Sequence, residues 1–390
     1  MFDFRILYCH CANAKIMPES VKDKVLSQLC EKNFSFMAVA DLCGVCAKAQ
    51  QIISSNILNH NDLKVISCHQ NAVRWLLDFA GLKDLKFTAF NMHSSKAEDI
   101  ISQVSNGENR KIQNEEPHNV LNNSAFQNQS SISINVKNEE KYKIVKRLLD
   151  SGFNTVVFGD ANSGFSKVLI YPTSFHRNTA KNVGSFSDKT VDINNLDNFV
   201  SELERIFNSD IEISGGQWYP WFPIINYDKC TNCMQCLSFC LFGVYGCDEE
   251  GKLRVVEPDK CKPNCPACAR VCPGMAIIFP KYPSAPINGG EIPEGQEKIK
   301  KEKVDISLLM GGNLYETLKK RNRQVKERFS SERNPETALK ERCKCLGELT
   351  KLIPPEILST LPSKQEMEKR AAEAAEKASQ ALKNKKKLEK

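Results

Sequence analysis

The sequence predicts an α/β amino-terminal part with a doubly wound, mostly parallel sheet, followed by a smaller α+β segment and a helical, basic C-terminal tail. Three observations support this prediction. Short apolar runs alternate with amphipathic stretches over the first hundred residues, a cysteine-rich repeat occupies residues 224–280, and lysine, alanine and glutamate dominate the end of the chain. A chain of 390 residues has room for two or three such domains.

The apolar runs of the first hundred residues have the length of strands, and the stretches between them have the length of helices. Gly81 ends the third helix, a position that favours glycine. Strands that alternate with helices in this way are typical of a parallel sheet covered by helices. We expect strands over 5–8, 36–39, 63–66 and 85–90, and helices over 20–30, 43–58, 71–80 and 96–104.

Residues 106–140 change character, because asparagine, glutamine and serine largely replace apolar residues. Such a composition buries too little surface to offset the entropy of ordering, so it predicts a disordered insert. The alternation resumes with a helix over 142–149, strands over 154–158 and 167–171, and a helix over 196–207. Helical patterns also occur over 308–323, 336–352 and 364–390. The predicted organisation is an α/β domain (1–105), the insert (106–140), an α/β continuation (141–215), a cysteine-rich domain (216–285), and a linker with a basic helical tail (286–390).

Eight of the 17 cysteines fall into two matching groups. An Asp-Lys pair precedes each group, and similar apolar residues follow each group. The segment is therefore an internal repeat, in which the second group contains one extra residue between its first two cysteines. The first group comprises Cys230, Cys233, Cys236 and Cys240, and the second comprises Cys261, Cys265, Cys268 and Cys272.

This spacing suits a cubane iron–sulfur cluster, which needs four thiolates. Cysteines at i, i+3 and i+6 of a tight loop can bind three irons, and the fourth lies too far along to bind the same cube. The pattern resembles the bacterial ferredoxin domain with two [4Fe–4S] clusters, in which the fourth cysteine serves the other cluster. The resemblance implies one cluster on Cys230, Cys233, Cys236 and Cys272, and a second cluster on Cys261, Cys265, Cys268 and Cys240.

The second group departs from the pattern, because three residues separate Cys261 from Cys265 where two separate Cys230 from Cys233. Zinc is the alternative occupant, since paired cysteines also form four-thiolate zinc sites. Two runs of four cysteines with a crossed fourth ligand exceed what zinc requires, which favours iron–sulfur clusters. Disulfides are not expected, because the chain begins without the pattern of a secretory signal.

Five further cysteines follow the first three predicted strands: Cys9, Cys11, Cys43, Cys46 and Cys68. The carboxyl ends of parallel strands share one edge, where ligands bind, so we expect these thiols to converge. The Cys9-His10-Cys11 arrangement resembles the amino-terminal module of heterodisulfide reductase A subunits. That resemblance implies a third [4Fe–4S] cluster on Cys9, Cys11, Cys68 and one of Cys43 or Cys46. A redox dithiol at Cys43 and Cys46, or ordinary buried cysteines, are the alternatives.

The composition predicts a cytoplasmic protein without a membrane span. Charged residues make up 26% and hydrophobic residues 41% of the chain, and its apolar runs are too short to cross a membrane. The net charge of +7 originates in the tail, where residues 298–333 carry 11 basic and 5 acidic side chains. A nucleic-acid-binding protein with structural clusters is an alternative that rests on this tail alone, and charge runs are usually solvated.

Together these patterns predict an iron–sulfur electron-transfer protein that exchanges electrons with redox partner proteins. The sequence shows neither a nucleotide-binding fingerprint nor a nucleophile constellation, so no catalytic residue is predicted. Substrate chemistry is accordingly assigned to a partner. The alternative is an oxidoreductase subunit of the heterodisulfide-reductase type, whose amino-terminal site acts on a thiol or disulfide.

Overall fold

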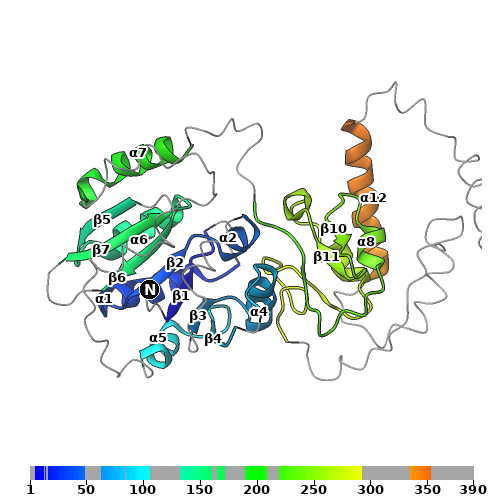
Figure 1. Cartoon of the computed structure of the whole chain (residues 1–390), viewed down its shortest axis with the longest axis horizontal. Coiled ribbons are helices and arrows are strands. Elements are labelled where there is room, and N and C mark those ends of the chain that lie inside the picture. Colours follow the sequence, from blue (N-terminus) through cyan, green and yellow to red (C-terminus); the bar gives the residue numbers. More distant parts are fainter. Residues whose placement is uncertain are drawn as a thin grey trace, which may run out of the picture. The chain divides into compact units, whose positions relative to one another are not determined.

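The computed structural model describes residues 5–12, 14, 16–48, 63–83, 85–105, 132–159, 165–171, 189–208, 219–291 and 334–352 (Figure 1). The chain divides into two compact units, which are described separately. Unit 1 comprises Met1–Asn226, Val255–Asn264 and Ile277–Glu291, and unit 2 comprises Tyr227–Arg254, Cys265–Ala276 and Ile292–Lys390. None of the described helices is both long and apolar enough to cross a membrane.

Unit 1 is built on one large sheet, which confirms the predicted α/β class. Among the described residues its strand order is β4-β3-β1-β2-β6-β7-β5-β8. The strands are β1 (Ile6–Cys9), β2 (Phe36–Val39), β3 (Leu63–Ser67), β4 (Phe87–Asn91), β5 (Ile132–Lys137), β6 (Asn154–Phe158), β7 (Phe165–Tyr171) and β8 (Lys189–Thr190). β4, β3, β1 and β2 are mutually parallel, whereas β6 and β7 join in antiparallel pairings and β8 runs parallel to β5.

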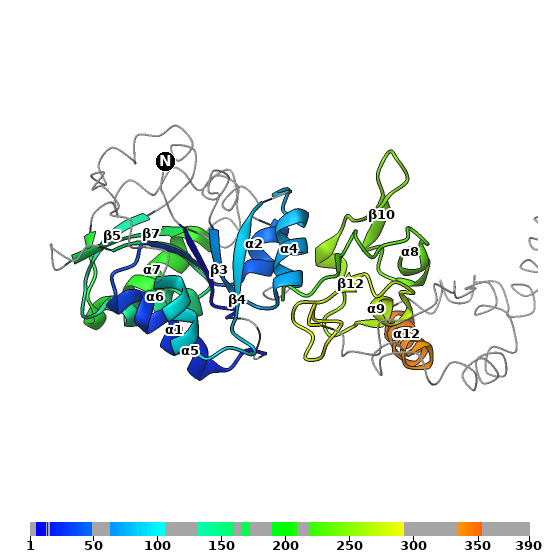
Figure 2. The ribbon, with the colours of Figure 1, turned by 90° about the horizontal axis from the view of Figure 1, so that it is seen from below.

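Helices connect the parallel strands. They are α1 (Glu19–Glu31), α2 (Leu42–Lys48), α4 (Gln70–Phe79) and α5 (Ala97–Ser105), followed by α6 (Lys141–Asp150), the short 3-10 helix η4 (Ile193–Asn195) and α7 (Leu196–Asn208). α1 lies beside α5 and α6, whereas α2 packs against α4 (Figure 2). β2 and β3 lie on opposite sides of β1, so the chain reverses its direction across the sheet between β2 and β3. Because both connections are right-handed, α1 and α2 cover opposite faces of the sheet.

The buried core explains why these elements form. Every residue of β1, β2 and β3 is buried, as expected for strands covered on both faces. Lys64 of β3 is a charged residue among these buried side chains. Its aliphatic part is buried, and its ammonium donates a hydrogen bond to the carbonyl oxygen of Val104. The predicted helix over 43–58 is described only as far as Lys48, and the remainder lies outside the described residues.

One strand lies within the segment predicted to be a disordered insert. β5 pairs with β7 in antiparallel register, with Ile134 opposite Val168, so the prediction is wrong for residues 132–137. Ile132, Ile134 and Val136 are buried and alternate with more exposed residues. This is the period-two pattern of a strand, and the asparagine-rich composition of the longer window concealed it. Residues 106–131 lie outside the described residues.

The first residues of the predicted linker, 286–291, belong to unit 1 and pack there. Ile287 and Asn288 are each 4% exposed, and the carbonyl oxygen of Ile287 accepts a hydrogen bond from the N–H of Phe279. Gly289 has a φ of +85°, and a Cβ atom there would lie 2.9 Å from the Cβ of Ala72 on α4. Glycine therefore permits both the left-handed conformation and the close approach.

The cysteine repeat forms short elements that recur at equivalent positions of the two groups. The helices α8 (Gln235–Phe239) and α9 (Ala267–Val271) each begin immediately before the third cysteine of their group. Asn232 and Asn264 each stand immediately before the second cysteine, and both adopt left-handed backbone conformations, with φ of 53° and 60°. Asparagine tolerates this region better than most residues. The strand pairs are β9 (Ile224–Ile225) with β12 (Ile277–Ile278), and β10 (Tyr245–Cys247) with β11 (Leu253–Val255), and the 3-10 helix η5 (Pro258–Lys260) precedes the second group.

A further helix, α12 (Pro335–Leu352), belongs to unit 2. It confirms the helix predicted over 336–352, and it packs against α9 (Figure 2). The predicted helices over 308–323 and 364–390 lie outside the described residues.

Candidate iron–sulfur sites

The first cysteine group wraps around a compact loop in unit 2. Cys230 and Cys233 precede α8 and are half-buried, whereas Cys236 lies on α8 and is 5% exposed. Left-handed residues at 232 and 234 turn the loop back on itself immediately before the helix. Charges on Cys230 and Cys233 both act on the pKa of Cys236, so the three thiols of this loop lie near one another.

The thiols of Cys272, Cys230 and Cys233 lie close enough to Cys236 to act on its pKa. Burial raises the pKa of Cys236 well above its usual range, and the charges of Cys272, Cys230 and Cys233 raise it further. These are the four residues that the resemblance to two-cluster ferredoxins assigns to one cluster. The thiol of Cys272 also accepts a hydrogen bond of 3.2 Å from the N–H of Ala276, the kind of contact that tunes a cluster ligand. A cubane cluster takes four thiolates, and these four thiols are buried or half-buried.

The second set is divided between the two units. Cys240, Cys265 and Cys268 belong to unit 2, whereas Cys261 belongs to unit 1, so their grouping rests on the sequence repeat. The hydroxyl of Tyr245 donates a hydrogen bond of 3.1 Å to the thiol of Cys268. Within the described part of the chain, no group of three or more His, Cys, Asp or Glu side chains has the arrangement of a site for a single metal ion.

The five amino-terminal cysteines lie near one another at the carboxyl ends of β1, β2 and β3. Each is less than 9% exposed. The thiol of Cys9 accepts a 3.4 Å hydrogen bond from the N–H of Leu42 and shares another with the thiol of Cys11. A charge on Cys9 would act on the other three: Cys43, Cys46 and Cys68. The structure therefore brings these thiols together at the sheet edge.

Burial sets the protonation of these thiols when no metal is bound. It raises the pKa of Cys68 to about 12, and it raises those of Cys43 and Cys46 well above their usual range. The hydrogen bond between Cys9 and Cys11 lowers the pKa of Cys9 and raises that of Cys11, because one thiol donates to the sulfur of the other. Buried thiols of raised pKa are poor nucleophiles, which does not favour a reactive dithiol at Cys43 and Cys46.

Two charged residues beside these thiols were not predicted. Asp41 follows β2 and Lys281 follows β12, and they form an ion pair of 2.5 Å in which each side chain is 2% exposed. The ammonium of Lys281 also lies 4.7 Å from the ring centroid of Tyr219. No spacing signal could have joined residues that are 240 positions apart. Asp41 raises the pKa of Cys43, after the larger effect of burial.

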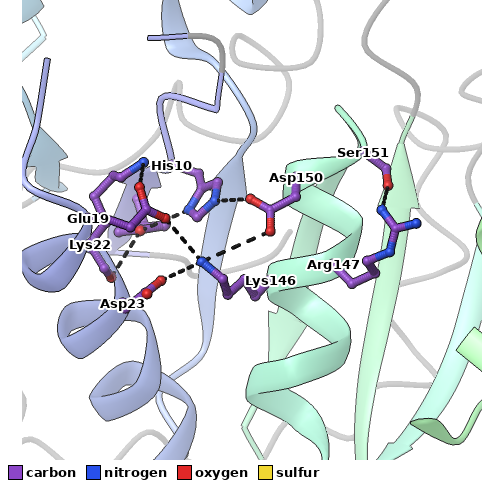
Figure 3. Close-up of polar contacts among 9 residues, drawn as sticks. His10, Glu19, Lys22, Asp23, Lys146, Arg147, Asp150 and Ser151 are labelled. Atoms are coloured by element: carbon purple, nitrogen blue, oxygen red, sulfur yellow. Dashed lines mark hydrogen bonds and ion pairs between the residues drawn. The ribbon is translucent and has the colours of Figure 1, made fainter. Parts of the chain in front are cut away.

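The histidine between Cys9 and Cys11 is directed toward α1 and α6 (Figure 3). His10 accepts or donates at both ring nitrogens, with the Tyr8 hydroxyl at 3.2 Å and an Asp150 oxygen at 2.7 Å. Beside it, the ammonium of Lys146 contacts Glu19 and Asp23, so ion pairs connect α6 to α1 (Figure 3). This environment fits a structural role for His10.

Comparison with known proteins finds similarity over a short segment. The chain is 49% identical over 61 residues to an uncharacterised ferredoxin of Methanocaldococcus jannaschii, which is 15% of this chain and 41% of that protein. It is 35% identical over 69 residues to the pyruvate synthase subunit PorD of the same organism, covering 18% of this chain and 78% of the subunit. It is 36% identical over 66 residues to PorD of Thermotoga maritima, covering 17% and 65%.

The repeated cysteine loops and short helices, together with these similarities, define a ferredoxin-type iron–sulfur protein. The chain belongs to the ferredoxin family that includes the PorD subunits of pyruvate synthase. It spans less than half of the length of the uncharacterised ferredoxin. No family model matches the chain. No solved structure matches it either.

Proposed function

We propose that this chain is an iron–sulfur electron-transfer protein with two [4Fe–4S] clusters in its ferredoxin segment. Cys230, Cys233, Cys236 and Cys272 hold the first cluster, and Cys261, Cys265, Cys268 and Cys240 hold the second. Such clusters supply one-electron transfer at potentials that burial, charge and hydrogen bonds to sulfur adjust. The observation that carries the proposal is the repeated cysteine spacing, together with the similarity to PorD and the influence of Cys230, Cys233 and Cys272 on the pKa of Cys236.

The amino-terminal thiols hold a third cluster in this proposal. Cys9, Cys11 and Cys68 supply three ligands, and Cys43 or Cys46 supplies the fourth. Their support is their shared position at the carboxyl edge of three neighbouring parallel strands, where α/β sheets place ligands. The eight ferredoxin cysteines all lie beyond residue 229, so the two cluster regions are separable by mutation.

The chain's partners are redox proteins in the cytoplasm. Three of the similar proteins are named as subunits of pyruvate synthase, so an oxidoreductase with several subunits is the class of partner that we propose. The chain itself then carries electrons, and the substrate chemistry belongs to the partner.

A second candidate is an oxidoreductase subunit of the heterodisulfide-reductase type. The specific observation in its favour is the shared hydrogen bond between Cys9 and Cys11, which lowers the pKa of one thiol and raises that of the other. A thiol of lowered pKa is the more reactive partner in thiol–disulfide exchange.

Anaerobic purification followed by iron and sulfide analysis and EPR spectroscopy tests the proposal. The ferredoxin segment alone should contribute about eight irons per chain, and a third cluster should raise the content to about twelve. A chain that binds zinc and no iron after anaerobic reconstitution would overturn the proposal. About eight irons, with reversible oxidation of Cys9 and Cys11, would favour the second candidate.

A further inference from the structure

α12 packs against the second cysteine group through a defined apolar face. Ala338 is 0% exposed and belongs to a buried cluster with Phe239 of α8 and with Ala267 and Val271 of α9. Cys265 packs against the same cluster. Asn334 starts the helix, because its side-chain oxygen accepts the N–H of Thr337 at 3.1 Å. The helix therefore has a fixed start and a fixed contact surface.

Two polar contacts hold α12 in one rotational setting. The guanidinium of Arg270 on α9 donates to both carboxylate oxygens of Glu341, at 3.1 and 3.2 Å. The guanidinium of Arg342 lies 5.0 Å from the ring centroid of Phe239. Residues 338, 341 and 345 recur at helical spacing, so the face that carries Ala338 and Glu341 also carries Cys345.

Cys345 is consequently directed inward, where it meets Cys265. Cys345 is 5% exposed, whereas Cys343, two positions earlier on the same helix, is exposed. The thiols of Cys345 and Cys265 share a hydrogen bond. Burial, together with the neighbouring Cys345, raises the pKa of Cys265 to about 12. A free cysteine next to a ligand cysteine gives this group a fifth thiol.

We propose that Cys345 is a second thiolate donor for the iron that the cysteine repeat assigns to Cys265. This inference rests on the proposed second cluster. With a cluster bound, the Cys345 sulfur would take the place of the Cys265 sulfur on that iron, and the Cys345 proton would pass to the released Cys265 thiolate. No electron is transferred in this step. Cys345 lies within hydrogen-bonding reach of Cys265, so its proton would have a direct path to the Cys265 sulfur.

The extra residue between Cys261 and Cys265 makes Cys265 the ligand of the second group that is easiest to replace. Cys265 follows Cys261 after three intervening residues, whereas Cys233 follows Cys230 after two. A longer loop holds its ligand with more conformational freedom. Cys233 is the equivalent second cysteine of the first group, and it therefore serves as the matched comparison.

Iron content and EPR of four variants, prepared anaerobically, test the inference. Alanine is used because it offers no donor atom. Cys265→Ala should keep the wild-type iron content, because Cys345 takes the position. Cys265→Ala with Cys345→Ala should lose the second cluster's EPR signal and up to about four irons. Cys265→Ala with Cys343→Ala should behave like Cys265→Ala, and Cys233→Ala should lose iron from the first cluster.

Equal iron loss in Cys265→Ala and in the double variant Cys265→Ala, Cys345→Ala would overturn the inference. The proposed second cluster of the wild-type chain would still stand. Absence of iron from the wild-type chain would instead overturn the proposed function. If Cys265→Ala is insoluble, a second measurement replaces it: the rate at which a chelator removes iron in air, compared among the wild type, Cys345→Ala and Cys343→Ala. Cys345→Ala should lose the second cluster several-fold faster than wild type, and Cys343→Ala should match wild type. Equal rates in all three chains would contradict the inference.

Discussion

The ammonium of Lys281 lies 2.5 Å from a carboxylate oxygen of Asp41, with both side chains 2% exposed. The other oxygen of Asp41 accepts the N–H of Gly44 at 3.2 Å, at the start of α2. Although burial opposes its charge, Asp41 holds the pKa of Lys281 above its usual range. The pair therefore joins the segment after β12 to the helix that carries Cys43 and Cys46.

The first prediction concerns the stability of unit 1. Lys281→Met should lower the free energy of unfolding by about 3 to 5 kcal/mol, because it leaves the Asp41 carboxylate buried without its partner. Denaturant unfolding followed by circular dichroism measures the change. Asp41→Asn in the same chain should restore part of the loss. Lys260→Met is the matched control, since Lys260 pairs with Glu257 at 3.7 Å on the surface and should cost less than about 1 kcal/mol.

The second prediction tests the amino-terminal thiols. Cys11→Ala should remove about four irons and one EPR signal, because a cluster that lacks one thiolate is usually lost. The signals of the ferredoxin segment should persist. Cys30→Ala is the control, since Cys30 is a buried thiol on α1 that was not assigned to any cluster. Unchanged iron in Cys11→Ala would remove the third cluster from the proposal.

The third prediction concerns β5. Ile134 is 0% exposed and pairs with Val168, so Ile134→Ala should cost about 2 to 5 kcal/mol through lost burial and the cavity that remains. Lys137→Ala, at the exposed end of the same strand, should change stability by less than about 0.5 kcal/mol. Similar unfolding midpoints for the two variants would show that β5 contributes little to the sheet.

The fourth prediction tests the docking of α12. Ala338→Asp places a carboxylate in the apolar cluster with Phe239, which is costly without a partner. The helix should leave α9, and tryptic cleavage after Lys340 should accelerate by about tenfold for each 1.4 kcal/mol of penalty. Lys344→Glu on the exposed side of the helix is the control and should not change that rate. Resistance of Ala338→Asp to trypsin would refute the docking.

The fifth prediction concerns acid. Hydrogen bonds from Lys22 and, with burial opposing, from Lys146 lower the pKa of Glu19 to about 2. A carboxyl group whose folded pKa is lowered stabilises the fold above its unfolded pKa, and that contribution disappears as the pH falls toward the folded value. The Glu19 side chain is 61% exposed, so solvent screening limits the effect to less than about 1 kcal/mol.

Denaturant unfolding of wild type and Glu19→Gln measures this contribution as a difference between the two chains. Wild type should be the more stable chain at pH 7, and the difference should shrink between about pH 4.5 and about pH 2. A difference that stays constant over this range would assign the stabilisation to something other than the Glu19 charge.

Local patterns predicted much of the fold. The four-residue apolar run Phe36–Val39 was predicted with the bounds that β2 has, because a strand buried on both faces is apolar throughout. The cysteine repeat predicted two equivalent loops, and α8 and α9 begin at equivalent positions of the two groups. These features depend on residues that are close together in the sequence, so a local pattern is enough to predict them.

The missed features depend on partners that are distant in the sequence. The Asp41–Lys281 pair and the contact of Cys345 with Cys265 join segments 240 and 80 positions apart. Each of these residues is unremarkable in its own local pattern, and only packing brings the pairs together. β5 was missed for a different reason, since a composition averaged over a long window outweighed the alternation of Ile132, Ile134 and Val136.

The pairing of Asp41 with Lys281 also imposes an order on biosynthesis. Lys281 leaves the ribosome 240 residues after Asp41, a delay on the order of 10 to 50 seconds at usual elongation rates. Both cysteine groups of the ferredoxin segment end before residue 281, so they have already been translated when the last part of unit 1 arrives. During nascent-chain growth the Asp41 carboxylate consequently lacks its counter-charge until Lys281 has been made, and the amino-terminal unit is complete only after both cysteine groups have been translated.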